Sequence, residues 1–213
     1  MTGRGAVAEA RWRETWALMR HAAPAAPLAE LLARYAEPHR AYHDLGHVLD
    51  CLGHAAEVRG RLAHPGSVEL ALWFHDAVYD PRAHDNEARS AELASRLLAS
   101  DASEEDLAHV RDLVLATRHP SRPAAHDARY VVDVDLAILG APPAAFEAYE
   151  RAIRQEYRWV PEPIYRRERA RVLRSLLALQ PLYLTAPFAA RFEEAARANL
   201  RAALARLAPE HGL

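Results

Sequence analysis

Apolar residues recur three and four positions apart along nearly the whole chain, and the breaks between these runs fall at proline, glycine and short polar segments. This spacing is typical of helices that bury one face. No run alternates for long enough to predict a β-strand. The pattern therefore predicts an all-α fold, with helices over about 7–20, 28–36, 43–61, 67–76, 86–99, 104–117, 130–139, 143–158, 162–179 and 187–207.

Residues with capping chemistry stand at several of these boundaries. Ser67 is placed to cap the fourth helix. Ser103, followed three residues later by Asp106, resembles a capping box at the start of the sixth helix. Gly140 is expected to end the seventh helix, and the prolines that follow it begin the eighth.

Length and composition narrow the class of protein. A chain of 213 residues with 51% hydrophobic residues suits one domain with a packed core. The formal charge of −2 and the pI near 6.6 argue against a protein that coats nucleic acid. No apolar run approaches the roughly 20 residues of a membrane span, and the N-terminus lacks the apolar core of a signal peptide. We expect a cytoplasmic protein that partners neither membranes nor nucleic acid.

The helix expected over 43–61 carries an unusual number of histidines. His43, His47 and His54 fall within roughly 40° of one another on a helical projection, which forms one stripe. Each histidine alone is more simply explained as part of a solvated face, but three together favour His47 as a metal ligand and leave His54 structural. Cys51 flanks the stripe; as the only cysteine it excludes an intrachain disulfide, and we take it to exclude a cysteine-based zinc site.

Two further segments place acidic groups inside apolar runs. His75 and Asp76 end the run ALWFHD, where a helix terminus can direct both side chains to one ion. Asp133 and Asp135 interrupt YVVDVDLAIL, and buried carboxylates are costly unless they are paired or bind a cation. Ordinary explanations are a polar helix end for the first pair, and an N-cap with a buried Asp–Arg pair for the second.

The order His47, then His75-Asp76, then Asp135 resembles the H…HD…D signature of the HD-domain superfamily of metal-dependent phosphohydrolases. The chain is most similar to a branch of predicted metal-dependent HD phosphohydrolases. The similar stretches lie within residues 38–160, and the tail segment FEEAARANL also fits. They are PHRAYHDLGHV, ALWFHDAVYD, DNEARSAEL, ATRHP, DVDLAILG and IRQEYRWV.

The resemblance implies a compact helical bundle that forms a single domain over 1–213, with its core at about 38–160 and the helices of 161–208 packed on it. It implies four metal ligands and two supporting residues. The implied ligands are His47, His75, Asp76 and Asp135, with His43 and Asp133 in contact with them. Such a donor set suits Mn²⁺, Co²⁺, Fe²⁺, Ni²⁺, Zn²⁺ or Mg²⁺.

The resemblance also implies a water made nucleophilic by the ion, with a small phosphorylated substrate, expected to be a nucleotide. Asp76 and Glu87 are the candidate catalytic residues. Glu87, at the start of the helix after the HD loop, would position or deprotonate the water, although a first-turn glutamate is equally well explained by the helix dipole. Asp80 is a weaker candidate for the same role. Arg40 and His119 are the candidate phosphate contacts.

Two other functional interpretations remain open at the level of sequence. A di-iron oxygenase of the HD type would need further histidines, and His84, His109, His119 and His126 lie in the required interval. A non-catalytic nucleotide-sensing module would keep the fold without the reaction.

The amphipathic C-terminal helix is compatible with a homodimer. Arg154 and its neighbours in IRQEY either line the pocket or form an ion-paired helix face.

Overall fold

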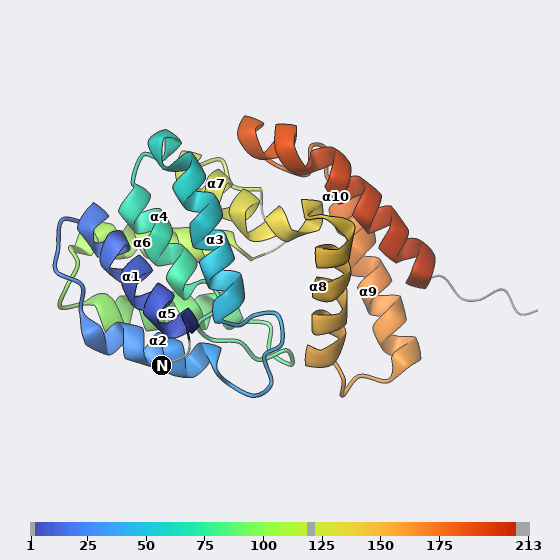
Figure 1. The fold of residues 1–213 in the computed structure, drawn as a ribbon, viewed down its shortest axis with the longest axis horizontal. Helices are drawn as coiled ribbons and strands as arrows, with labels where there is room; N and C mark the ends of the chain where they lie inside the picture. Colours follow the sequence, from blue (N-terminus) through green and yellow to red (C-terminus); the bar gives the residue numbers. More distant parts are fainter. Residues whose placement is uncertain (1–2, 119–121, 208–213) are drawn as a thin grey trace, which may run out of the picture. The chain divides into compact units, whose positions relative to one another are not determined.

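The computed structural model describes residues 3–118 and 122–207, and within these ranges the fold is all-α, as the sequence predicts, with no β-strand. The chain divides into two compact units, with the boundary after Val134. The helices, labelled in Figure 1, are α1 Gly3–Leu18, α2 Ala25–Tyr35, α3 Leu45–Val58, η1 Arg59–Arg61, α4 Pro65–Phe74, α5 Asn86–Leu98, α6 Glu104–Ala116, α7 His126–Asp135, η2 Leu136–Gly140, α8 Pro143–Glu156, α9 Glu162–Leu177 and α10 Ala186–Leu207.

Helix α4 is the centre of the first unit. It contacts α1, α3, α5 and α6, and it is buried around its whole circumference, with apolar side chains at most positions other than Ser67 and Glu69. Leu70, Trp73 and Phe74 are fully buried. A helix that is apolar on all sides is stable only inside a core. Burial of α4 on every side therefore fixes the position of its C-terminal end, where His75 and Asp76 follow.

A buried polar network ties α4 to its neighbours. The fully buried carboxylate of Glu69 accepts a hydrogen bond of 2.8 Å from the Thr15 hydroxyl on α1, and its other oxygen accepts bonds from the Arg59 guanidinium on η1. The indole of Trp73 donates to the same Thr15 oxygen at 3.1 Å. A buried carboxylate with these partners is compensated for its lost hydration, so the network orients α1, α4 and η1 together.

Several helix starts differ from the sequence prediction, among them those of α1 and α7, which begin four residues earlier, and those of α3 and α4, where caps are involved. Helix α3 begins at Leu45 rather than at His43, because the Asp44 side chain caps it by accepting from the backbone N–H groups of Gly46 and His47. Helix α4 begins at Pro65, so Ser67 lies inside the helix and does not cap it. The predicted Ser103 cap of α6 is confirmed, since its hydroxyl accepts from the Asp106 N–H at 3.1 Å.

The second unit consists of η2 and the helices α8, α9 and α10 (Figure 1). Helix α10 packs on η2 and on α9. The amide of Asn199 on α10 donates 2.8 Å hydrogen bonds to the carbonyls of Leu139 and Ala141. Gly140 allows this close approach, because a Cβ at that position would lie 2.6 Å from the Cβ of Phe192. The predicted role of Gly140 as the end of the seventh helical segment is confirmed.

Glu193→Gln is expected to lower the free energy of unfolding at neutral pH by about 1 kcal/mol. The Glu193 carboxylate accepts from the N–H groups of Leu182 and Tyr183 at 3.0–3.1 Å and pairs with Arg197. Burial alone would raise its pKa, but these hydrogen bonds and the guanidinium lower it.

Because the folded-state pKa lies below the unfolded value, this stabilisation is present above the unfolded pKa and is lost as the pH falls through the folded one. Urea unfolding at pH 7 and in acid should therefore show a difference between wild type and Glu193→Gln that shrinks in acid. Exposed Glu194→Gln is the matched control and should change little. A difference that persists undiminished in acid would contradict the assignment.

Candidate metal centre

Four potential metal ligands from three helical segments meet at one point. His47 lies in the first turn of α3, Cys51 one turn later, His75 directly after α4, and Asp135 at the end of α7. One donor atom from each lies within 4.8 Å of every other. His47, Cys51 and His75 are buried, and Asp135 is half-buried. Asp135 is the last residue of α7 and is also the first residue of the second unit.

The two histidines face each other through their Nε2 atoms, which lie 3.0 Å apart. The Nδ1 of His75 lies 2.9 Å from the Leu72 carbonyl, and because a carbonyl can only accept, this nitrogen carries the proton. When this ring is neutral, its Nε2 carries no proton and faces the centre. This arrangement, in which one ring nitrogen donates to a backbone carbonyl and the other is free to ligate, is typical of metal-binding histidines.

Asp76 brings a carboxylate to the same point. Its Oδ2 atom lies 3.1 Å from the Nε2 of His75 and 3.6 Å from the Nε2 of His47. Burial raises the pKa of Asp76, but the imidazoles of His75, His43 and His47 hold that pKa well below its usual range. The carboxylate is therefore ionised. Imidazole nitrogens and a carboxylate oxygen that approach one another this closely are donors of the kinds that a divalent transition-metal ion takes, so the donor set fits such an ion.

Cys51 is the ligand candidate that the sequence analysis missed. Its Sγ lies 3.7 Å from both ring nitrogens of His47, and the residue is only 2% exposed. Cys51 thus belongs to a group that could hold an ion, a possibility that the sequence analysis set aside because the chain has a single cysteine. The available signal was the spacing: Cys51 follows His47 by four positions on α3 and so shares its face.

Arg40 is buried beneath the centre, and this position does not suit the phosphate contact expected from the sequence. Its guanidinium donates to the carbonyls of His43, Asp76 and Ala77 at 2.9, 2.7 and 3.1 Å. It also pairs with Glu37 at 3.0 Å, and its side chain is fully buried. The guanidinium carbon lies over the rings of two tyrosines at 5.1 and 5.5 Å, which are those of Tyr35 and Tyr79. Arg40 thus fixes the backbone that carries Asp76.

His43 lies beside the centre, although it precedes α3. Its ring stacks on that of Tyr79, with centroids 4.2 Å apart, and stands edge-on to the ring of His47 at 6.1 Å. The charge of His43 also contributes to the low pKa of Asp76. These contacts agree with its expected supporting role, but they come from the loop before α3 rather than from a shared helical stripe.

The two aspartates of the DVD triplet have different positions. Asp135 belongs to the group of converging donors, whereas Asp133 is fully buried within α7 and is not one of that group. Successive aspartates two positions apart on a helix point in different directions, so only one can reach the ion. The structure thus favours Asp135 as the ligand.

The remaining candidates of the proposed chemistry are not members of the four-residue donor group. Glu87 is half-buried in the first turn of α5, and Asp80 is exposed in the preceding loop, where it accepts from the Arg82 N–H at 2.9 Å. His119 lies outside the described residues. The structure gathers neither Glu87 nor Asp80 with His47 and His75.

The additional histidines of the di-iron alternative are also not gathered at the centre, as far as the described residues go. His109 packs edge-on against His64, with ring centroids 4.7 Å apart. His126 lies 2.8 Å from the Arg61 carbonyl, and His84 is exposed. His54, which we expected to be structural, is likewise not part of the donor group.

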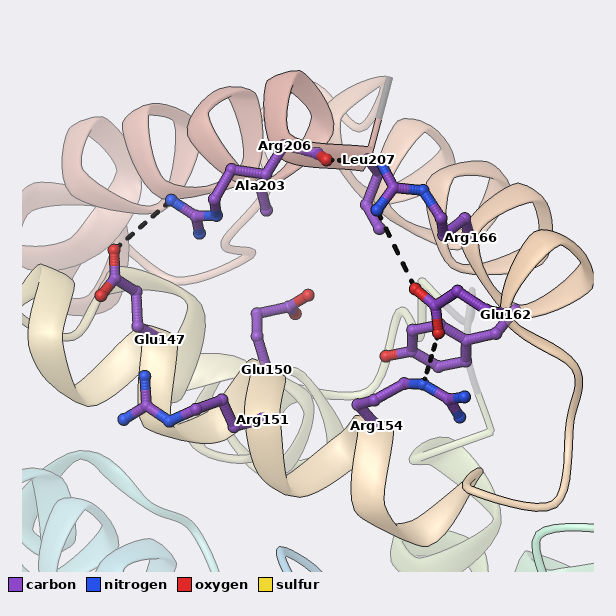
Figure 2. A pocket seen from close by; sticks show the side chains of 10 residues that line it. Glu147, Glu150, Arg151, Arg154, Glu162, Arg166, Ala203, Arg206 and Leu207 are labelled. Carbon is purple, nitrogen blue, oxygen red and sulfur yellow. Dashed lines mark hydrogen bonds and ion pairs between the residues drawn. The ribbon is translucent and has the colours of Figure 1, made fainter. Parts of the chain in front are cut away.

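A separate hollow of about 350 Å³ lies within the second unit, between α8, α9 and α10 (Figure 2). Arg154 and Arg166 pair there with Glu162, and Arg206 pairs with Glu147. Arg154, from the IRQEY stretch, thus both lines a hollow and takes part in an ion-paired face. Because acidic and basic side chains alternate and pair, the hollow presents no surface of a single charge sign to a ligand.

The described residues thus define an all-helical protein with a buried His/Cys/His/Asp cluster that can hold a metal ion and is compatible with an HD-type site. Among these residues, no helix is long and apolar enough to cross a membrane. Comparison with protein-family models, with curated proteins and with solved structures gives no significant match.

Proposed function

We propose that this protein is a metal-dependent phosphohydrolase of the HD type, which cleaves a phosphate ester or anhydride of a small metabolite, with a nucleotide as the expected class. The observation that carries the proposal is the convergence of His47, His75 and Asp76 on one buried point, with their potential donor atoms 3.0–3.6 Å apart. The same residues occupy the H and HD positions of the HD signature, and Asp135 occupies its final position.

In this proposal His47, His75, Asp76 and Asp135 hold the ion. A bound divalent ion supplies Lewis acidity, which lowers the pKa of water and offsets charge developing on phosphorus. His75 keeps its donor nitrogen directed at the centre because Leu72 holds the other nitrogen. Arg40 orients the Asp76 backbone, and buried surroundings strengthen each electrostatic contact.

Glu87→Gln is expected to slow turnover without removing the metal, because the variant keeps the size of the side chain but loses a proton acceptor. The measurement is steady-state phosphate release alongside metal content. The matched control is Glu92→Gln, on the same helix α5 and exposed. An unchanged rate would leave Glu87 as a first-turn glutamate favoured by the helix dipole.

Phosphate release from a panel of nucleotides, with Mn²⁺, Co²⁺ or Zn²⁺ added in separate reactions and with a chelator as control, tests the proposed function. The proposal expects metal-dependent release from at least one member of the panel. Two bound irons per chain with no release would favour the oxygenase alternative. Nucleotide binding with neither metal nor release would favour a sensing module.

A further inference from the structure

We infer that Cys51 is itself a ligand of the metal ion, and that its thiolate makes the centre select zinc, cobalt or ferrous ions over magnesium and manganese. This inference rests on the metal centre proposed above. It adds a donor that the H…HD…D signature does not contain, and it turns the open question of metal identity into a specific expectation.

The position of the thiol carries the inference. Cys51 lies one turn after His47 on α3, so both side chains leave the same face of one rigid helix. The Sγ atom lies 3.7 Å from the ring nitrogens of His47. A sulfur at about 2.3 Å and a nitrogen at about 2.0 Å from one tetrahedral ion are about 3.5 Å apart. The observed separation is therefore close to that of two ligands on one ion, without movement of the helix.

The partner across the centre has a matching distance. The Nε2 atoms of His47 and His75 are 3.0 Å apart. Two imidazole nitrogens on one ion at about 2.0 Å are separated by about 2.8–3.3 Å for angles between 90° and tetrahedral. The donor atoms of both histidines, Cys51 and Asp135 all lie within 4.8 Å of one another, so one ion can accept them together.

The chemistry of the thiol then determines which ions are favoured. On binding, the Cys51 S–H bond breaks, its proton passes to solvent, and the sulfur keeps the electron pair that it donates to the ion; no oxidant or reductant is needed. Soft thiolate and imidazole donors suit zinc and similar transition ions, whereas magnesium takes oxygen ligands. A centre with two histidines, one thiolate and one or two carboxylates should therefore discriminate against hard ions.

The ordinary alternative is that Cys51 fills space in the core as a small apolar side chain. The two explanations differ in a property that can be measured without turnover. A space-filling thiol has no electronic contact with the ion, whereas a ligating thiolate produces an intense charge-transfer absorption in the near ultraviolet when the ion is cobalt.

The experiment is cobalt titration of the full chain, followed by absorption spectroscopy. Because Cys51 is the only cysteine, any thiolate–cobalt band reports on this residue alone. We expect the band in the wild-type protein and its loss in Cys51→Ser. His54→Gln is the matched control, since it removes an imidazole from α3 outside the donor group and should keep the band.

A competition titration gives the second readout. Cys51→Ser should bind zinc more than about tenfold more weakly, since even the loss of an outer partner of a ligand costs that much. Its affinity for magnesium should not fall. Cys51→Ala serves the same purpose if the serine variant does not fold, which circular dichroism would show.

Bound cobalt without a thiolate band in the wild-type protein would overturn the inference, as would zinc affinity unchanged in both Cys51 variants. These failures are distinguishable from failure of the proposed function. Metal-dependent phosphate release without the band would remove Cys51 from the ligands and leave the hydrolase. The band without any release would establish the thiolate ligand and refute the hydrolase.

Discussion

Replacing Asp76 by alanine is expected to reduce metal-dependent phosphate release to the level found with a chelator, while the protein keeps its helical content. Asp76 supplies the carboxylate that lies 3.1 Å from the Nε2 of His75, and its ionised state depends on the surrounding imidazoles. Without it, the ion loses an anionic ligand and the two histidine nitrogens face each other without a compensating charge. The measurement combines phosphate release, metal content and circular dichroism.

Asp85→Ala is the matched control for this prediction. Asp85 precedes α5, its side chain is 63% exposed, and it makes only a long surface ion pair with Arg89. Its replacement removes the same carboxylate chemistry from a nearby position and should leave metal content and turnover unchanged. Retained turnover in Asp76→Ala would remove Asp76 from the proposed catalytic machinery.

Arg40→Ala is expected to have the second largest effect, through both stability and metal affinity. The substitution leaves the carbonyls of His43, Asp76 and Ala77 without their donor in a buried site. Unsatisfied buried acceptors of this kind should lower the free energy of unfolding by about 2–4 kcal/mol. Because the backbone of Asp76 is no longer held, metal affinity should fall by about 10- to 100-fold.

Urea unfolding of the apoprotein and zinc titration of folded samples separate these two effects. Arg40→Lys keeps the charge but cannot donate to three carbonyls from a planar fork, so it should recover only part of the loss. Arg89→Ala removes a surface arginine with a long ion pair and should change neither quantity. Wild-type stability and metal affinity in Arg40→Ala would contradict a positioning role.

The helices were predictable from sequence because their determinants are local. Helical spacing of apolar residues, proline and glycine breaks, and the Ser103 cap fixed most element boundaries to within a few residues. The start of α3 was missed because Asp44 competes with His43 for the N-terminal position, and its short side chain is the better cap. That error also placed His43 on a helical stripe that it does not occupy.

The candidate centre was predictable only in part. The order of His47, His75-Asp76 and Asp135 carries the signature, and these residues do converge. The role of Arg40 could not be predicted, because its three carbonyl acceptors come from a loop and a helix end more than thirty residues apart in the sequence. Cys51 was not considered as a ligand because the chain has only one cysteine. A single thiol is sufficient when histidines supply other donors.

The most direct test of the account is the metal content of the purified full chain, measured by mass spectrometry after incubation with zinc and dialysis. The account predicts one ion per chain in the wild-type protein and the loss of that ion in His75→Ala. A wild-type chain that retains no ion, with the same melting temperature in the presence and absence of metal, would contradict the central claim that these residues form a metal centre.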